Sequence, residues 1–587
     1  MTYRPSRKTL QPPRFALALC EDEMTASKTG GELVVEMLCS LGVKYVFGVV
    51  GGQTLAITDA IIDNPDIEFV HTRHEGAAAV MADAYGRLTG TPAACISTTG
   101  PGATNLITGV GGAFRDSSPA FILTCNNHGE NIHKDDAQNA DHVELLRPLT
   151  KYSRLVAYAS SLKQAMEEAY INAMTGNPGP VHLDFTRDMI EGVVANPPVI
   201  PKVHPARKWV CERPSANQPS LARAAGMILS ADRPVIWLGN GGNRSAGGDA
   251  VLAFAEALNI PVVTTFNGIG AVRTTHPLVF GAVSRMGTNL STQVLNEADL
   301  VIALGNSLNA VSTTRWKRKL PAILQVDIDP TMIGRYYAET TTGIVADLKS
   351  FCDDILEALA PEADKAKSGR ADWIAKLQAA RKAWWASTEP TRDSPQGVLS
   401  PADIVRALRD ASPTDTLLIP DAGNPGVWSF LWEVTEPNSY IKPVGFGNMG
   451  FALPSAIAAA LIDPKRPVLA LIGDGSLGMS LGELETLARV GGRVCIVVLN
   501  DSSYGNIRQE QELHFNGRTI GVDFNRIDFG QVARGMGVDG EVISDLDALV
   551  ARVKAVFQGD RPALVDVPLD RSVNAWTYPA FVPHQVQ

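Results

Sequence analysis

Short runs of β-branched and apolar residues that end in Gly or Asp recur along the chain, and Ala- and Leu-rich helical stretches separate them. This alternation is typical of βαβ units, which place their strands side by side in parallel sheets. The expected strands form three groups: residues 44–49, 68–71, 93–97, 120–125 and 180–185; residues 235–239, 261–265, 300–305 and 322–327; and residues 416–420, 467–473, 493–499 and 563–567. The sequence therefore predicts an α/β protein with three doubly wound parallel-sheet domains in series.

The domain limits follow from the stretches between these groups. Several prolines in residues 196–218 oppose a helix or a central strand, and a charged helix followed by a Pro- and Gly-containing stretch occupies residues 361–400, so both read as linkers. The basic, aperiodic start is expected to be a disordered tail. The resulting domains and tails are residues 1–28 (tail), 29–195, 219–360, 401–575 and 576–587 (tail).

Composition excludes two broad classes of function. The net charge of −10 argues against a general nucleic-acid binder, because no broad basic face would neutralise phosphates. No apolar run reaches the roughly 18 residues of a membrane span. The seven cysteines are scattered without a C-x-x-C pair and favour a reducing compartment, so a cytoplasmic location is expected.

The last third of the chain contains the most informative motif. Gly473-Asp474-Gly475-Ser476 closes one strand, and the next strand ends in Asn500-Asp501. Neighbouring parallel strands end at the same sheet edge, so Asp474 and Asp501 can approach one another. Magnesium prefers oxygen ligands and keeps positions open for phosphate oxygens, and a helix start offers free N–H groups to a diphosphate. The motif predicts a metal-bridged diphosphate site, although two ordinary turns remain an alternative.

Several motifs in the same order resemble one enzyme family. The G-D-G motif followed by the Asn-Asp pair is similar to the signature of thiamine-diphosphate enzymes. Residues 445–454, 72–78 and 99–106 resemble the acetolactate synthase-like branch, which includes pyruvate oxidase and decarboxylase. The resemblance extends from about residue 28 to 575. It implies that the first domain binds the aminopyrimidine, that the third binds the diphosphate, and that the cofactors are thiamine diphosphate and Mg²⁺.

The resemblance also implies roles for individual residues. The metal would be held by Asp474, Asp501 and the carbonyl of Ser503, and the Met449 side chain would separate the two cofactor rings. The remaining residues implied to contact the cofactor are Gly51, Gly423, Asn424, Gly447, Gly473, Gly475, Ser476, Tyr504, Gly505, Asn506 and Ile507.

Glu75 carries the central catalytic prediction. Considered without the other motifs, a carboxylate at the start of an Ala-rich helix indicates a group that stabilises the positive end of the helix dipole. The resemblance implies instead that Glu75 binds the pyrimidine nitrogen and holds a proton near neutral pH, which needs a buried apolar setting that raises its pKa. Gln138 is the second implied catalytic residue.

The implied reaction is decarboxylation of a 2-oxo acid such as pyruvate, followed by transfer of the acyl group to a carbonyl acceptor or by its release. Since Glu75 and the metal residues lie in different domains, the resemblance implies active sites shared between subunits of a homodimer or homotetramer.

The chain departs from acetolactate synthase at several pocket positions. Ala137 replaces a Phe, Asn506 a Met and Glu510 a Trp, and residues 305–311 lack the Arg and Asp that hold flavin and help to bind the second substrate. We therefore expect a more polar, roomier pocket with a different donor or acceptor. The substrate candidates are Gln138, Lys151, Asn506 and Glu510, with His133, Lys134 and His142 as further candidates for an anionic substrate.

Other readings stay open. A 2-oxo acid decarboxylase and a lyase similar to 2-hydroxyacyl-CoA lyase or oxalyl-CoA decarboxylase are alternatives within the family. The loop Gly239-Asn240-Gly241-Gly242-Asn243 follows a strand, so the central domain would hold FAD, ADP or nothing, with neither nucleotide favoured. The same loop supports a nucleotide-dependent oxidoreductase, and a non-catalytic regulatory subunit is the third alternative.

Overall fold

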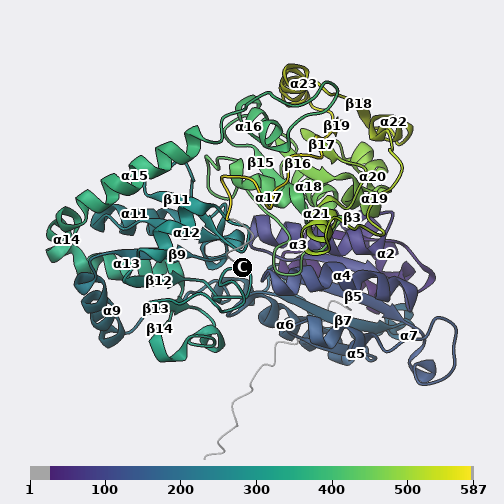
Figure 1. Cartoon of the computed structure of the whole chain (residues 1–587). Helices are drawn as coiled ribbons and strands as arrows, with labels where there is room; N and C mark the ends of the chain where they lie inside the picture. The colour runs from purple at the N-terminus through teal and green to yellow at the C-terminus, as the bar shows by residue number, and fades with distance from the viewer. Residues whose placement is uncertain (1–26, 583–587) are drawn as a thin grey trace, which may run out of the picture.

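A computed structural model describes residues 27–582 and shows three parallel sheets, each with its own helices (Figure 1). The predicted disordered tail therefore lies outside the described residues except for its last two. Lys28 and Thr29 form strand β1 (Lys28–Thr29), which pairs antiparallel with β8 (Val193–Val194) at the end of the first domain. The predicted fold class, three doubly wound α/β domains in series, is confirmed.

The first sheet has the strand order β3-β2-β4-β5-β7-β6. Its interior strands are almost wholly buried, as expected for a parallel sheet covered on both faces. Its elements are α1 (Gly30–Leu41), β2 (Tyr45–Gly48), α2 (Leu55–Ile62), β3 (Glu68–His71), α3 (Glu75–Thr89), β4 (Ala93–Ser97), α4 (Pro101–Arg115), β5 (Ala120–Asn126), α5 (His142–Leu146), β6 (Ser153–Val156), α6 (Ala159–Met174), β7 (Pro180–Thr186) and α7 (Arg187–Glu191).

The middle sheet has the order β11-β10-β9-β12-β13-β14. Successive strands are added on one side of β9 up to β11 and then on its other side from β12 onward, so the strand order reverses between β9 and β12. Ligands of such sheets bind outside the carboxyl ends of the strands at this reversal. Its elements are α9 (Gln218–Ser230), β9 (Pro234–Leu238), α10 (Gly241–Arg244), α11 (Gly248–Leu258), β10 (Val262–Thr265), β11 (Val279–Val283), α12 (Asn289–Asn296), β12 (Leu300–Leu304), β13 (Ala322–Asp327), β14 (Thr341–Val345), α13 (Leu348–Leu359), α14 (Ala363–Gly369) and α15 (Ala371–Ala386).

The third sheet has the order β15-β16-β17-β19-β18. Its helix α18 packs on α3 of the first domain, so one apolar core runs between the two domains. Its elements are α16 (Pro401–Ala411), β15 (Leu417–Pro420), α17 (Asn424–Trp428), α18 (Ala452–Ile462), β16 (Val468–Gly473), α19 (Asp474–Ser480), α20 (Glu483–Val490), β17 (Val494–Asn500), α21 (Gly505–His514), α22 (Phe529–Gly535), β18 (Asp539–Val542), α23 (Leu546–Gln558) and β19 (Ala563–Pro568).

Both expected linkers differ from the structure. The linker over 196–218 contains one helical turn, α8 (Ala206–Trp209), in the Pro-free stretch between Pro205 and Pro214. In the linker over 361–400, helices α14 and α15 pack on the middle domain, because Leu377 and Trp384 are buried in its core.

The expected C-terminal tail also packs on the middle domain over its described part, residues 576–582. Phe581 is buried, its backbone pairs with Thr288, and the carbonyl oxygen of Ala580 accepts hydrogen bonds from the Trp384 indole and from the backbone of Asn289. Residues 576–582 therefore form part of a folded core. Among residues 27–582, no helix combines the length and apolar character needed to cross a membrane.

Candidate active site

Two acidic side chains meet at the carboxyl edge of the third sheet, where β16 and β17 end side by side. Asp474 is 3 % exposed, and burial together with the nearby charge of Asp501 raises the pKa of Asp474 to about 7. Burial also raises the pKa of Asp501. The Oδ2 atom of Asp474 is buried and accepts no hydrogen bond from the described residues. A cation between the two carboxylates would satisfy this oxygen and remove their repulsion.

The backbone around these carboxylates packs too closely for a side chain at either of two glycines. A Cβ on Gly475 would lie 2.7 Å from the Tyr504 ring, and a Cβ on Gly505 would lie 2.3 Å from Oδ2 of Asp501. Ser503 is buried beside them, and its backbone N–H donates to Oδ1 of Asp501 at 3.1 Å. Residues 27–582 contain no cluster of three or more His, Cys, Asp or Glu side chains suited to a metal. Two carboxylates with open positions fit magnesium bridged to phosphate.

The loop after β15 joins the same edge. Gly423 adopts a φ of 77°, which favours glycine, and Asn424 follows it at the start of α17. Nδ2 of Asn506, in the first turn of α21, donates to Oδ1 of Asn424 at 3.0 Å. The structure thus brings together the predicted residues after three adjacent strands: Gly423, Asn424, Gly473, Asp474, Gly475, Ser476, Asp501, Ser503, Tyr504, Gly505, Asn506 and Ile507.

The loop that contains Gly447 and Met449 is fixed by a residue that the sequence analysis did not select. The buried carboxylate of Asp421 accepts hydrogen bonds from the backbone N–H groups of Ala422, Gly450 and Ala452 at 2.7, 3.2 and 2.8 Å. Gly447 has a φ of 73° and open space where a side chain would project. The only sequence signal for Asp421 was its position at the end of a strand.

The predicted residues of the first domain gather at the carboxyl edge of their own sheet. Gly51 follows β2, and a Cβ there would lie 2.6 Å from Thr98, which follows β4. The carbonyl oxygen of Gln138 accepts a hydrogen bond from Thr99 at 3.2 Å, and the Gln138 backbone has a positive φ of 60°. Gly51, Glu75 and Gln138 therefore occupy one edge.

Glu75 begins helix α3, as the sequence predicts, but its surroundings differ from the expectation. The side chain is partly exposed, and Nδ2 of Asn105 donates to its Oε2 at 2.9 Å. Among residues 27–582 the expected buried, apolar setting is not formed, because the Glu75 side chain stays partly exposed and contacts the polar Asn105.

In this chain Glu75 is also far from the loop that carries Met449. A Cβ on Gly102, near the start of α4, would lie 3.4 Å from Oε1 of Glu75, whereas Gly111 near the other end packs on Phe446. The nine residue steps from Gly102 to Gly111 span about 14 Å of helix. One chain therefore does not place Glu75 beside its own Met449.

The loop before Glu75 is fixed to the third domain by a contact that sequence reasoning missed. The Oε1 atom of Glu483, on α20, accepts hydrogen bonds from the backbone N–H groups of Arg73 and His74 at 3.0 and 3.1 Å. Burial raises the pKa of Glu483. No local pattern marks this residue, since its partners are 409 and 410 positions away.

Two predicted substrate contacts lie elsewhere. The Lys151 ammonium donates to the carbonyl oxygens of Thr175 and Asn177 at 2.8 Å each and faces the middle domain, and burial lowers its pKa to about 8. His142 is fully buried, with Nδ1 2.9 Å from Asp184 and with Nε2 accepting from the backbone of Gly100. Its role is to hold the Gly100 turn, because both ring nitrogens already have protein partners.

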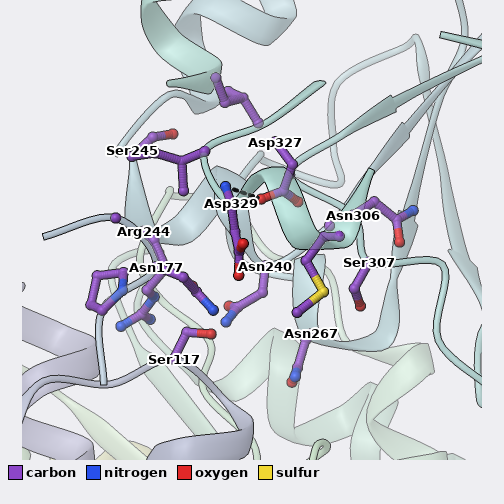
Figure 2. Close-up of a pocket in the computed structure, with 18 of the residues that line it drawn as sticks. Ser117, Asn177, Asn240, Arg244, Ser245, Asn267, Asn306, Ser307, Asp327 and Asp329 are labelled. Atoms are coloured by element: carbon purple, nitrogen blue, oxygen red, sulfur yellow. Dashed lines mark hydrogen bonds between the residues drawn. The ribbon is translucent and has the colours of Figure 1, made fainter. Parts of the chain in front are cut away.

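A cavity of about 350 Å³ opens at the switch point of the middle sheet, where the first and middle domains meet (Figure 2). It is lined by the glycine-rich turn after β9, by Asn306 and Ser307 after β12, and by Asp327 and Asp329 after β13. Burial raises the pKa of Asp327 to about 6, and Oδ1 of Asp327 accepts from the backbone of Asp329 at 3.0 Å. Sequence reasoning had singled out the turn, but not the cavity that it shares with Asp327 and Asp329.

Two polar atoms in this cavity lack partners among the described residues. Nε of Arg244 and Oγ of Ser245 are buried without a hydrogen bond, and both residues belong to the turn after β9. Burial lowers the pKa of Arg244 to about 10, and the positive charge of Arg87 adds to this effect. A polar anionic ligand would satisfy these atoms.

The sequence matches three family models along its length. Residues 28–145 match the N-terminal TPP binding domain of thiamine pyrophosphate enzymes, residues 221–359 their central domain and residues 421–567 their C-terminal TPP binding domain.

Curated relatives agree with this match. The acetolactate synthase large subunit of Haemophilus influenzae is 30 % identical, over 93 % of this chain and 96 % of that protein. The probable large subunit of Methanocaldococcus jannaschii is 31 % identical over 92 % of each chain, and the isozyme 1 large subunit of Escherichia coli is 30 % identical over 94 % and 96 %. With the two sheet edges described above, these similarities place the chain in the family of thiamine-pyrophosphate-dependent enzymes, in its acetolactate synthase-like branch.

Proposed function

We propose that this enzyme decarboxylates a 2-oxo acid such as pyruvate and transfers the remaining acyl group to a carbonyl acceptor, with thiamine diphosphate and Mg²⁺ as cofactors. The observation that carries the proposal is the buried pair Asp474 and Asp501. The Oδ2 atom of Asp474 has no hydrogen-bond partner among the described residues, and it lies at the sheet edge where β15, β16 and β17 end. When bound, thiamine diphosphate supplies the carbon nucleophile and the electron sink that this chemistry requires.

Each residue then has a limited task. Asp474, Asp501 and the carbonyl of Ser503 hold the metal, and Gly423, Asn424 and the start of α21 hold the diphosphate. Met449 would support the cofactor from a loop that Asp421 fixes. Glu75 would donate a hydrogen bond to the pyrimidine and transfer its carboxyl proton. Gln138 lies at the same sheet edge as Glu75.

The separation of Glu75 from Met449 within one chain supports a site shared between two copies. The first-domain edge of one copy would cover the third-domain edge of the other, which would also bury Glu75 against the cofactor. We therefore propose a homodimer, alone or paired into a tetramer, as the smallest active unit.

The test is the Glu75→Gln variant, reconstituted with thiamine diphosphate and Mg²⁺. We expect carbon dioxide release from 2-oxo acids to fall at least 100-fold while the cofactor still binds, since glutamine keeps the shape but holds no transferable proton. Glu144→Gln, an exposed change in the same domain, is the matched control. Full turnover by Glu75→Gln would refute the mechanism. Product analysis with and without an aldehyde acceptor separates ligation from release and from a CoA-dependent lyase.

We propose that the middle domain binds a nucleotide that contains a diphosphate group, either FAD or ADP. Support comes from the cavity at the switch point and from its unpartnered Arg244 and Ser245 atoms. The purified protein is denatured and the released ligand is identified by absorbance and mass. A yellow ligand assigns a flavin, an adenine nucleotide without flavin assigns ADP, and an empty cavity that binds neither compound in titration contradicts the proposal.

A further inference from the structure

A buried network of hydrogen bonds lies behind the Glu75 edge of the first sheet, and the proposed mechanism does not use it. Asp184, on β7, is 1 % exposed, and the ring of His142 is 0 % exposed. Oδ1 of Asp184 accepts from the Thr124 hydroxyl at 2.6 Å, and Oδ2 accepts from Nδ2 of Asn126 at 2.8 Å. Nδ1 of His142 lies 2.9 Å from the same Oδ1. A buried network with its partners in place holds the groups at its ends rigidly.

The direction of the hydrogen bonds decides which nitrogen of His142 carries the hydrogen. The backbone N–H of Gly100 can only donate, and its nitrogen lies 3.1 Å from Nε2 of His142. Nε2 therefore accepts and has no hydrogen, so the single hydrogen of the neutral ring is on Nδ1, which donates to Asp184. The other tautomer would direct an N–H against the N–H of Gly100. Asp184 thus selects the tautomer of His142 that can hold Gly100.

Gly100 needs this restraint because its backbone conformation is unusual. Its φ of 62° and ψ of −107° favour glycine, and a Cβ there would lie 2.3 Å from the carbonyl oxygen of Gln138. The carbonyl oxygen of Gly100 accepts from the backbone N–H of Thr104 at 3.0 Å, within the first turn of α4. His142 therefore fixes the point where α4 begins and against which the loop with Gln138 packs.

The first part of α4 carries the contacts to Glu75. Nδ2 of Asn105 donates to Oε2 of Glu75 at 2.9 Å, and a Cβ on Gly102 would lie 3.4 Å from Oε1. Because the amide N–H occupies Oε2, the carboxyl proton that the proposed mechanism requires belongs on Oε1. A shift of α4 would release Oε2 and leave the proton without a fixed direction.

From these contacts we propose that His142 is a positioning residue, whose hydrogen bond to Gly100 holds α4 so that the proton of Glu75 stays on Oε1. Asp184 acts one step further away, by keeping His142 in the tautomer that accepts. The inference rests on the proposed function, because it concerns how Glu75 presents its proton. The buried ring acts through α4 and does not touch a substrate.

Two substitutions of His142 separate this role from general packing. His142→Gln places an amide oxygen near the position of Nε2, where it can accept from Gly100, whereas His142→Met has a similar length and no such acceptor. Both remove the ring N–H that Asp184 accepts, so both should lower Tm by similar amounts. Only His142→Met should lower kcat for carbon dioxide release, roughly 10- to 100-fold, since displacing reacting groups by about 1 Å costs this much. The KM for the 2-oxo acid and the Kd of thiamine diphosphate should stay nearly unchanged.

The matched control is His204→Met, in the linker after the first domain. The His204 ring is also buried, with Nε2 2.9 Å from Glu167 and Nδ1 accepting from the backbone N–H of Ala206 at 3.2 Å. It has the same kinds of partner as His142 but none near Glu75. This variant should lower Tm without lowering kcat.

The protein without cofactor gives two readouts that do not depend on turnover. Hydrogen–deuterium exchange of the peptide that contains Gly100 should be severalfold faster in His142→Met and nearly unchanged in His142→Gln. In the unchanged protein with ¹⁵N-labelled histidine, Nδ1 of His142 should be protonated and Nε2 unprotonated.

The outcomes separate this inference from the proposed function. The opposite tautomer of His142, equal kcat values for His142→Gln and His142→Met, or an equal loss in His204→Met would overturn the inference alone. Absence of any thiamine-dependent turnover in the unchanged protein would overturn the proposed function together with it.

Discussion

The Asp421 carboxylate offers the sharpest test of how the loop around Met449 is held. Asp421→Asn keeps the size of the side chain but replaces one acceptor oxygen with an NH₂ group, which would face a backbone N–H. Losing one charge-assisted hydrogen bond costs about 1.5–3 kcal/mol, and an unsatisfied buried donor costs about 1–3 kcal/mol. Burial of the charged carboxylate destabilises the unchanged protein and raises the pKa of Asp421 to about 6. The neutral asparagine avoids this cost, so the net loss of stability is smaller than the sum of the two terms.

We therefore expect a net loss of about 2–3 kcal/mol. For a domain of this size such a loss lowers the melting temperature by roughly 5–10 °C. Displacement of Gly447 and Met449 should also weaken thiamine diphosphate binding at least tenfold. Melting curves with and without thiamine diphosphate and Mg²⁺, followed by calorimetric titration of the cofactor, measure both effects.

The matched control is Asp545→Asn, the same chemical change at the exposed N-cap of α23, where Asp545 accepts from the backbone of Ala548 at 2.8 Å. Asparagine caps helices as well as aspartate does, so this variant should melt within about 1 °C of the unchanged protein. Asp421→Asn with unchanged melting and unchanged cofactor affinity would show that the three backbone hydrogen bonds do not fix the loop.

Three further predictions follow from buried groups. Asp474→Asn should weaken Mg²⁺ binding at least tenfold in calorimetry, and unchanged affinity would remove Asp474 from the metal site. Burial lowers the pKa of His182 to about 4, so protonation favours the unfolded chain. Stability should therefore fall by up to about 3 kcal/mol as pH drops from about 6.5 to 4. His182→Gln should flatten this dependence in melting curves, and an identical pH profile would contradict it. Arg87→Lys should cost about 3 kcal/mol, because lysine cannot form the paired hydrogen bonds to Asp83 and the bond to Asp116; a loss below 1 kcal/mol in unfolding experiments would contradict this.

The sequence predicted every interior strand of the three large sheets but only two of their six edge strands, β3 and β15. All thirteen expected strands correspond to strands in the structure, whereas the short pair β1 and β8 and the strands β6, β11, β14 and β18 were not expected. Each of these last four lies at an edge of its sheet. Edge strands are covered on fewer sides and do not need a continuous apolar run, as the exposed pattern of β18 illustrates.

Site residues whose neighbours follow from strand order could be predicted, whereas those whose neighbours depend on domain packing could not. Asp474 and Asp501 could be placed together because strand order alone brings two strand ends to one edge. Glu483 could not, because its partners depend on how whole domains pack. The surroundings of Lys151 could not be predicted for the same reason: its local sequence resembles the family, but its ammonium is directed toward the middle domain.

The packing of residues 576–582 on the middle domain has a consequence for biosynthesis. The core around Trp384 and Phe581 is completed by residues that are translated after the whole third domain. The middle domain therefore keeps an apolar face uncovered while residues 401–575 are translated. The middle domain would therefore complete its folding after the third domain has been translated. A chain truncated just after the third domain would lose packing in the middle domain first.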